Sequence, residues 1–345
     1  MPQNGKRLKV GIVGGAFAGT LHAEGWIATN RADVVAVAAP SKETRDNFTR
    51  KFGVRSYEDA KSMLEKEELD VISLTLPNVF HKELTVLAAS KGIHVVCEKP
   101  LAINLNDAKE MVDAANKFGT KLLYAEQIIF APRYRKVKEL IDAGSFGQLV
   151  HIGHRERHGG PHAKWFRDIK MSGGGVTLDM GIHGIGLISY LLKPAKITHV
   201  YARITSIDKN SAVDDHCLLT LEFDNKVLAT VDASWVAPGG VDDVLEVLGR
   251  DGYVRADLAR GQTLDLFTLA GSSEVGEKAE TNKGWLKIPH EEARSWGWYA
   301  EIEHFASVIL DGVTPLISGE DGYQALKVAM AAYESAKTNQ RIAIN

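Results

Sequence analysis

Three polar residues have the types and spacing for acid–base chemistry: Lys99, Asp179 and His183. Asp179 and His183 are four residues apart, so on a helix their side chains share one face. Near the start of a helix the dipole keeps an aspartate ionised, and a histidine exchanges protons near neutral pH. A lysine ammonium can stabilise an oxygen that becomes negative during a reaction. Judged by residue type alone, an aspartate and a histidine at this spacing more often form a local hydrogen bond than a catalytic pair. A lysine at the end of a strand is more often a solvated surface charge.

The segments before residue 126 alternate short β-branched runs with longer amphipathic ones, which predicts a parallel sheet covered by helices. The expected strands are Leu8–Val13, 34–38, 71–76, 93–97 and 121–125. The expected helices are 20–29, Lys42–Phe52, 59–67, 79–90 and 107–118. Lys99 then follows the fourth main strand, at the edge where doubly wound folds bind ligands. Pro100 favours an extended backbone at Lys99, which directs the lysine towards that edge.

A glycine-rich turn follows the first expected strand. Gly14 and Gly19 stand at the first and third positions of a dinucleotide fingerprint, and Ala16 replaces the second glycine. Small residues there let backbone N–H groups approach a pyrophosphate at a helix N-terminus. Because the turn opens a β–α–β series, residues 1–126 are predicted to form an α/β Rossmann domain that binds NAD(P). The turn contributes Gly14, Ala16, Phe17, Ala18 and Gly19.

The end of the second expected strand bears on the choice between NAD and NADP. An acidic residue there would bind the adenosine ribose, but the strand continues Ala-Pro-Ser-Lys without one. Ser41, Lys42 and Arg45 could instead receive a 2′-phosphate, which favours NADP over NAD. The alternative, that Lys42 and Arg45 only solvate a helix face, stays open.

Beyond residue 126 apolar residues recur at every second position, which is typical of antiparallel strands with one buried face. The clearest examples are 217–223 and 227–235. The remaining expected elements are a basic helix at 133–142, a strand at Leu149–Arg157, a surface loop at 271–283 and closing helices at 299–310 and 323–337. Residues 127–345 are therefore predicted to form an α+β domain with a large, mainly antiparallel open sheet.

With its Glu-Lys-Pro segment at 98–100, the chain resembles the glucose–fructose oxidoreductase, inositol dehydrogenase and MocA (Gfo/Idh/MocA) family of sugar and polyol dehydrogenases. The resemblance covers nearly the whole chain and includes, in order, His22, Leu76, Pro77, Asn78, His81, Glu98, Lys99, the glycines 173–175, Asp179 and His183. It implies that Lys99, Asp179 and His183 line the reaction centre. It also implies cofactor contacts at Leu76, Pro77, Asn78, His81, Glu98 and Lys99. Gly186 departs from the pattern, because many members carry a second acid there.

For such a family the reaction is hydride removal from a secondary alcohol, which also requires loss of the hydroxyl proton. We expect His183 to act as the acid or base, with Asp179 orienting it or binding a substrate hydroxyl. Lys99 would polarise the reacting oxygen. The alternative assignment makes Lys99 the proton acceptor. The second domain would bind the substrate and form a homodimer or homotetramer through its sheet, as the resemblance also implies.

Four histidines raise the question of a metal site: His151, His154, His158 and His162. Their spacings of three and four would align ligands on a helix. However, the segment up to residue 157 is strand-like, and the Gly-Gly-Pro at 159–161 would break a helix. The sequence therefore predicts no metal site.

A substrate-binding loop is the better interpretation of the polar and aromatic residues after this strand. His158, His162, Trp165 and Arg167 offer hydrogen bonds and an aromatic face to a sugar ring, although Trp165 could equally be a core residue. Glu126, just beyond the last strand of the first domain, is a further candidate for substrate contact. Alternatively, Glu126 lies on the surface and contacts no substrate.

Composition limits the partners. A net charge of −3 over 345 residues gives no electrostatic case for nucleic acid or an anionic membrane. The two cysteines, Cys97 and Cys217, and the absence of an apolar leader favour a reducing, cytoplasmic location. No membrane partner is expected, because no apolar run approaches the length of a bilayer span.

Three other functions stay open. The nicotinamide could be used transiently, oxidising and re-reducing one sugar to permit elimination or epimerisation. The chain could be a dinucleotide-responsive regulatory protein that has lost chemistry, although such a sensor would not need Lys99, Asp179 and His183 together. A metal-dependent hydrolase is the weakest alternative.

Overall fold

The computed structural model describes residues 7–207, 211–259, 263–268, 279–289 and 292–344. They form two compact units. The first contains the described residues up to Gln127 together with Gly297–Tyr323, and the second contains Ile128–Trp296 and the chain from Gln324 onwards. Most of the loop expected at 271–283 lies outside the described residues.

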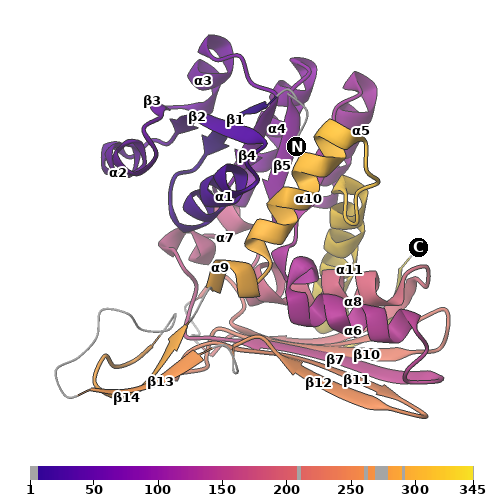
Figure 1. Cartoon of the computed structure of the whole chain (residues 1–345). Coiled ribbons are helices and arrows are strands. Elements are labelled where there is room, and N and C mark those ends of the chain that lie inside the picture. Colours follow the sequence, from indigo (N-terminus) through magenta and orange to yellow (C-terminus); the bar gives the residue numbers. More distant parts are fainter. Residues whose placement is uncertain (1–6, 208–210, 260–262, 269–278, 290–291, 345) are drawn as a thin grey trace. The chain divides into compact units, whose positions relative to one another are not determined.

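The first unit is built on a six-stranded sheet with the order β3-β2-β1-β4-β5-β6, in which every pair is parallel (Figure 1). Its strands are β1 (Leu8–Val13), β2 (Ala32–Ala38), β3 (Arg55–Tyr57), β4 (Val71–Leu74), β5 (His94–Glu98) and β6 (Leu122–Ala125). Its helices are α1 (Phe17–Ala28), α2 (Lys42–Phe52), α3 (Ala60–Lys66), α4 (His81–Ser90), α5 (Leu105–Phe118) and α10 (Trp298–Asp311). The predicted doubly wound parallel sheet is confirmed.

Register brings the carboxyl ends of the central strands to one edge of this sheet. Val13 of β1 pairs with Leu74 of β4, and Leu74 pairs with Cys97 of β5. The order reverses between β1 and β4, and open α/β sheets bind ligands at such a switch point. Lys99 follows Cys97 by two residues and therefore lies at this edge.

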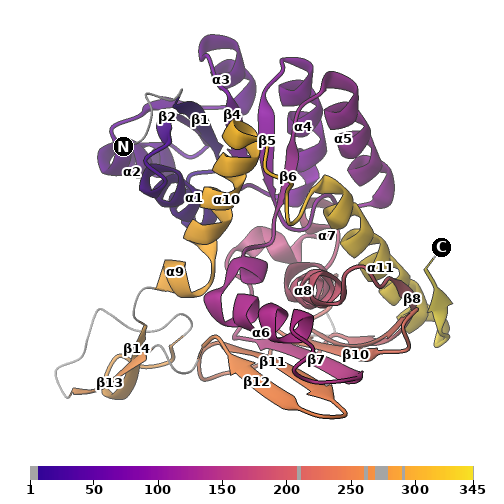
Figure 2. The ribbon, with the colours of Figure 1, turned by 45° about the vertical axis from the view of Figure 1, so that its right-hand side comes forward.

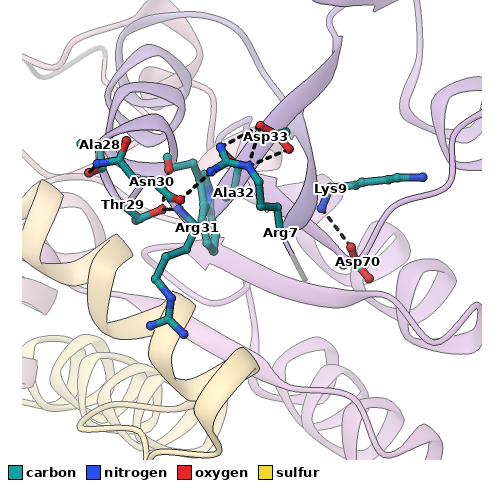
Figure 3. Close-up of polar contacts among 10 residues, drawn as sticks. Arg7, Lys9, Ala28, Thr29, Asn30, Arg31, Ala32, Asp33 and Asp70 are labelled. Carbon is teal, nitrogen blue, oxygen red and sulfur yellow. Dashed lines mark hydrogen bonds and ion pairs between the residues drawn. The ribbon is translucent and has the colours of Figure 1, made fainter. Parts of the chain in front are cut away.

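Polar contacts fasten the amino ends of the strands. The Arg7 guanidinium donates to both carboxylate oxygens of Asp33 and to the carbonyl oxygen of Ala32 (Figure 3). The backbone N–H of Lys9 donates to Asp70 over 2.9 Å, which links β1 to the start of β4 (Figure 3). The opposite, carboxyl edge of the sheet carries the candidate functional residues.

Helix α10 differs from the sequence analysis, which placed its residues in the second domain. It contacts α1, and a Cβ added at Gly25 of α1 would lie only 2.9 Å from Cγ1 of Ile302. Arg31 also forms an ion pair with Asp311 at 2.6 Å. Because the apolar face of α10 packs on α1, this late segment of the chain completes the first unit.

The second unit contains a seven-stranded sheet with the order β12-β11-β7-β10-β9-β8-β15. Its strands are β7 (Leu149–Arg157), β8 (Ile197–Thr205), β9 (His216–Phe223), β10 (Leu228–Ser234), β11 (Asp242–Gly249), β12 (Tyr253–Asp257) and β15 (Ile342–Ala343). Only the pair β7 and β10 is parallel among these strands, so the predicted mainly antiparallel sheet is confirmed. A separate hairpin joins β13 (Thr263–Thr268) to β14 (Gly284–Pro289).

Helices cover one face of the large sheet. Figures 1 and 2 show α6 (Pro132–Asp142) and α8 (Ile182–Leu192) lying along it. The short helices α7 (Ile169–Ser172) and α9 (Glu292–Ser295) and the long α11 (Gly319–Thr338) complete the set, with α11 divided between the two units. On the other face, large apolar side chains are exposed at Tyr201, Leu218, Leu228, Leu248 and Tyr253.

One helical stretch, Ile169–Leu192, is long and apolar enough to cross a membrane by length and composition alone. The sequence analysis did not anticipate this, because Asp179 and His183 interrupt the apolar run. Over the 18 most apolar consecutive residues of this stretch, 94% are buried inside the structure. Such burial is typical of a core helix.

Candidate active site

The glycine-rich turn at the end of β1 leaves no room for side chains. Gly14 has a φ of +96°, and a Cβ there would lie 2.1 Å from the carbonyl oxygen of Thr75. A Cβ at Gly19 would lie 1.8 Å from the carbonyl oxygen of Gly14. The Thr75 hydroxyl donates to that same oxygen over 2.6 Å. The turn is therefore held tightly against β4 and the first turn of α1.

The N-terminus of α1 has the features of an anion site. Ala16 is its N-cap, and the first turn carries no acidic residue. Ala16 and Phe17 are exposed and Ala18 is half-buried, so the first turn of the helix lies at the surface of the unit. The positive end of the helix dipole can thus receive a pyrophosphate. These residues fit a dinucleotide, even though Ala16 replaces a glycine.

The three candidates for a 2′-phosphate already have local partners. Ser41 is the N-cap of α2 and accepts the Thr44 N–H over 3.3 Å. Lys42 pairs with Asp46 at 2.5 Å on an exposed helix face. Arg45 donates to the carbonyl oxygen of Ala39 and pairs with Glu58. The Lys42 side chain is 79% exposed and that of Arg45 only 11%, and the preference for NADP remains a prediction.

Glu98 anchors Lys99 at the end of β5. Its Oε2 accepts the backbone N–H of Lys99 over 3.1 Å, and its Oε1 lies 3.2 Å from Nε2 of His22. His22 and Glu98 are buried, whereas Lys99 is half-buried. The ring of His22 also contacts Trp298 of α10, edge to face at 5.7 Å. Glu98 thus holds Lys99 through the backbone N–H of the lysine, and Lys99 remains partly accessible.

His81 connects two of the predicted cofactor segments. Its Nε2 lies 3.0 Å from the carbonyl oxygen of Leu76, and its Nδ1 lies 3.1 Å from that of Pro100. Burial lowers the pKa of this imidazole below its ordinary value, which favours the neutral ring. Between these contacts, Pro77 is half-buried and Asn78 buried. His81 therefore positions the segments around Leu76 and Lys99.

Three buried carboxyl groups gather behind Lys99. Glu98, Glu126 and Glu301 of α10 are each at most 7% exposed. Burial, followed by the charges of Glu98 and Glu126, raises the pKa of Glu301 well above its ordinary value. Sequence reasoning missed Glu301, because α10 was assigned to the other domain. Its one signal was a charged residue on the apolar face of an amphipathic helix.

In the second unit, glycines and Asp214 fix the segment that precedes Asp179. A Cβ at Gly175 would lie 2.0 Å from the carbonyl oxygen of Asp214. The Asp214 carboxylate accepts hydrogen bonds from the N–H of Gly175, the N–H and hydroxyl of Thr177, and the Tyr333 hydroxyl, at 2.6–2.9 Å. Sequence reasoning missed Asp214, because a polar stretch between strands carries no distinguishing pattern.

Asp179 lies in a π-helical turn, Thr177–Gly181, that leads into α8. The sequence analysis expected one regular helix for Asp179 and His183, and this wider turn corrects it; such turns recur at functional sites. Both side chains are buried, at 3% exposed. The indole N–H of Trp235 donates to the Asp179 carboxylate over 2.9 Å. Trp235, directly after β10, was predicted only as a strand residue.

The predicted substrate loop lies beside Trp235. Trp165 stacks on Phe166 with ring centroids 3.8 Å apart, and Phe166 contacts Trp235 edge to face. The Arg167 guanidinium lies over the Trp235 ring at 5.7 Å. The rings of His158 and His162 contact each other at 5.4 Å. The second unit thus brings this loop together with Asp179, while Lys99 and Glu126 belong to the first.

Comparison with known proteins agrees with both units. A family model described as "Oxidoreductase family, NAD-binding Rossmann fold" matches residues 8–126. A second, "GFO/IDH/MocA C-terminal domain", matches residues 134–255. The two units therefore define an NAD-binding oxidoreductase. The chain belongs to the Gfo/Idh/MocA family.

Several full-length relatives are named as dehydrogenases. The myo-inositol 2-dehydrogenase of Thermotoga maritima is 27% identical over 97% of this chain and 98% of its own length. The scyllo-inositol 2-dehydrogenase (NAD(+)) of Bacillus subtilis is 28% identical, with coverage of 98% and 97%. Among solved structures, GenD2 from gentamicin A biosynthesis, in complex with NAD, has a TM-score of 0.93 and 27% identity, and covers 100% of this chain and 99% of that one.

Replacing Asp214 with alanine tests the support of the Asp179 segment. The change removes the acceptor of the N–H and hydroxyl of Thr177 and of the Tyr333 hydroxyl, and leaves the Gly175 N–H only its longer bond to Tyr333, so we expect the free energy of unfolding to fall by about 3 kcal/mol or more. Asp224→Ala is the control, because that carboxylate accepts one backbone N–H, at 3.2 Å, and is exposed. Urea unfolding measures both variants. Equal, small losses would contradict the supporting role of Asp214.

Proposed function

We propose that this protein transfers a hydride between NAD(P) and a secondary hydroxyl or ketone of a sugar, cyclitol or related polyol. The observation that carries the proposal is the anchoring of Lys99 by Glu98 at the carboxyl edge of the NAD-binding sheet. The named activities of the inositol dehydrogenases among its relatives support the substrate class. The buried Asp179 and His183 of the second unit supply the acid–base groups.

Each residue has a defined task in the oxidation direction. Lys99 donates a hydrogen bond to the substrate oxygen and stabilises its developing negative charge. His183 accepts the hydroxyl proton, as the C–O single bond becomes a C=O double bond. Asp179, itself fixed by the Trp235 indole, orients His183 or binds a neighbouring hydroxyl.

The cofactor site is assigned to the turn at Gly14–Gly19, with Leu76, Pro77 and Asn78 beside it. When bound, the nicotinamide supplies the acceptor for the substrate's carbinol hydrogen and its electron pair. Glu98 and His81 hold the backbone around Lys99, so that the ammonium is in place before the substrate arrives. The loop containing His158, His162, Trp165 and Arg167 is assigned to the sugar ring, and Glu126 to a substrate hydroxyl.

His183→Asn tests the acid–base assignment. We expect kcat to fall by about 10²–10⁴-fold, with cofactor affinity unchanged, because the amide cannot exchange the proton. His199→Asn on β8 is the matched control. The assay pairs NAD and NADP with sugars, inositols, sugar acids and ketosugars, and follows net NAD(P)H formation. Turnover of His183→Asn within a few-fold of wild type would refute the assignment.

Lys99→Met separates the two possible proton acceptors in the same assay. If His183 is the base, this variant keeps the wild-type pH dependence of kcat at a lower rate, whereas His183→Asn loses it. The opposite pattern would make Lys99 the base. Product formation without net NAD(P)H would instead favour transient redox chemistry. Cofactor binding without turnover of any substrate would favour a regulatory protein.

Lys42→Ala tests the preference for NADP. If this ammonium exchanges Asp46 for a 2′-phosphate, KM for NADP should rise about tenfold and KM for NAD should not change. Lys51→Ala on the same helix, whose lysine pairs with Glu24, is the control. Equal KM changes for both cofactors would mean that Lys42 only solvates the helix.

We also propose a cytoplasmic homodimer or homotetramer formed through the exposed face of the large sheet. Five large apolar side chains on that face, including Leu218 and Leu228, support this. Light scattering at micromolar concentration should give a mass of at least twice the chain's 37.7 kDa. Leu218→Glu should lower that mass, whereas Val313→Glu, an exposed position in the first unit, should not. A monomeric wild type would contradict the proposal.

A further inference from the structure

Three metal-ligating side chains meet inside the second unit, on strands β7 and β11. His154, Glu156 and Asp243 place one ligand atom each within 4.8 Å of one another. His154 and Glu156 are two residues apart on β7, and Asp243 is the register partner of Glu156 on β11. All three therefore project from the same face of the sheet. They are 2%, 7% and 0% exposed.

The imidazole of His154 is the unusual member. Both of its ring nitrogens are buried and make no hydrogen bond within the described part of the chain. Its Nε2 lies 3.4 Å from Oδ1 of Asp243. A Cβ added at Gly184 of α8 would lie 2.9 Å from Nδ1, so the helix backbone covers that side of the ring. A buried imidazole in this state costs free energy unless Nε2 gains a partner.

The Asp243 carboxylate is likewise half satisfied. Oδ1 accepts the hydroxyl hydrogen of Tyr134 from α6, whereas Oδ2 is buried and has no hydrogen-bond partner among the described residues. Directly across the strand pair lies Glu156, and like charges at opposed positions destabilise a sheet. A nearby cation, Arg133, donates to the backbone carbonyl of Asp257 on the neighbouring strand β12.

One divalent ion would satisfy these groups together. It would bond at once to the imidazole lone pair of His154 and to Oδ2 of Asp243, and Glu156 would supply a further carboxylate oxygen. One nitrogen and two carboxylate oxygens form a donor set that suits Zn²⁺ and similar ions. Zinc bonds of about 2.0–2.2 Å place tetrahedral ligand atoms about 3.4 Å apart. Nε2 of His154 and Oδ1 of Asp243 already lie 3.4 Å apart, and Glu156 would move in to complete the set.

We propose that His154, Glu156 and Asp243 bind a divalent transition-metal ion of the Zn²⁺ type. Tyr134 orients the Asp243 carboxylate through its hydrogen bond, as outer partners of metal ligands do. The ion joins β7 to β11 beneath α6 and α8, so its role is structural. Of the four histidines considered in the sequence analysis, this site uses His154 alone. His151 lies within hydrogen-bonding distance of the Thr230 hydroxyl instead.

Zinc titration of the full-length chain tests this site. The protein is first treated with EDTA, and Zn²⁺ is then added in a calorimeter. We expect one ion per chain. His154→Gln and Asp243→Asn should each weaken binding by at least about 100-fold, and Tyr134→Phe by about 10-fold. His151→Gln, on the same strand but outside the cluster, should bind like wild type.

Two results would overturn the proposal. One is the absence of stoichiometric Zn²⁺ binding by the wild type. The other is unchanged affinity in folded His154→Gln and Asp243→Asn, with folding checked by circular dichroism, because Arg133 or a proton would then balance the cluster. If both variants fail to fold, crystals of the wild type soaked in Co²⁺ decide. An anomalous peak between His154 and Asp243 supports the site, and a peak only elsewhere excludes it.

Discussion

The fold depends on contacts between backbone segments that are so close that no side chain fits between them. At Gly19 a Cβ would overlap the carbonyl oxygen of Gly14, and at Gly14 one would overlap that of Thr75. These contacts press α1, β1 and β4 together at the sheet's switch point, where the helix amides are presented. The second unit repeats the arrangement, because Gly175 lies against the backbone of Asp214. In both units the glycines set where a helix begins, and the helix sets where the polar residues lie.

Buried hydrogen bonds then hold the candidate site residues. Glu98 fixes the backbone of Lys99, and Trp235 fixes the carboxylate of Asp179. Burying such groups is costly unless they are hydrogen-bonded. Burial and the charges of Glu98 and Glu126 raise the pKa of Glu301, which favours its neutral form.

The sequence predicted much of this, because periodicity and turn chemistry are local. The strands of the parallel sheet lie within one or two residues of their expected bounds, except β3, whose polar Arg55 and Ser56 gave no strand pattern. The motif residues Lys99 and Glu98 could also be identified, although their roles remain predictions. What could not be predicted depends on distant partners. The π turn at Asp179, the acceptor role of Asp214 and the placement of α10 all arise from packing between segments far apart in the chain.

The placement of α10 has a consequence for how the protein is made. Ile302 and its neighbours cover Gly25 on α1, yet they follow about 170 residues of the other unit. During synthesis, therefore, α1 stays uncovered and the nucleotide-binding unit stays incomplete until nearly the whole chain has left the ribosome. Contacts so far apart in sequence slow folding and prolong the exposure of apolar surface. A fragment that ends at the last strand of the parallel sheet would keep that surface exposed permanently.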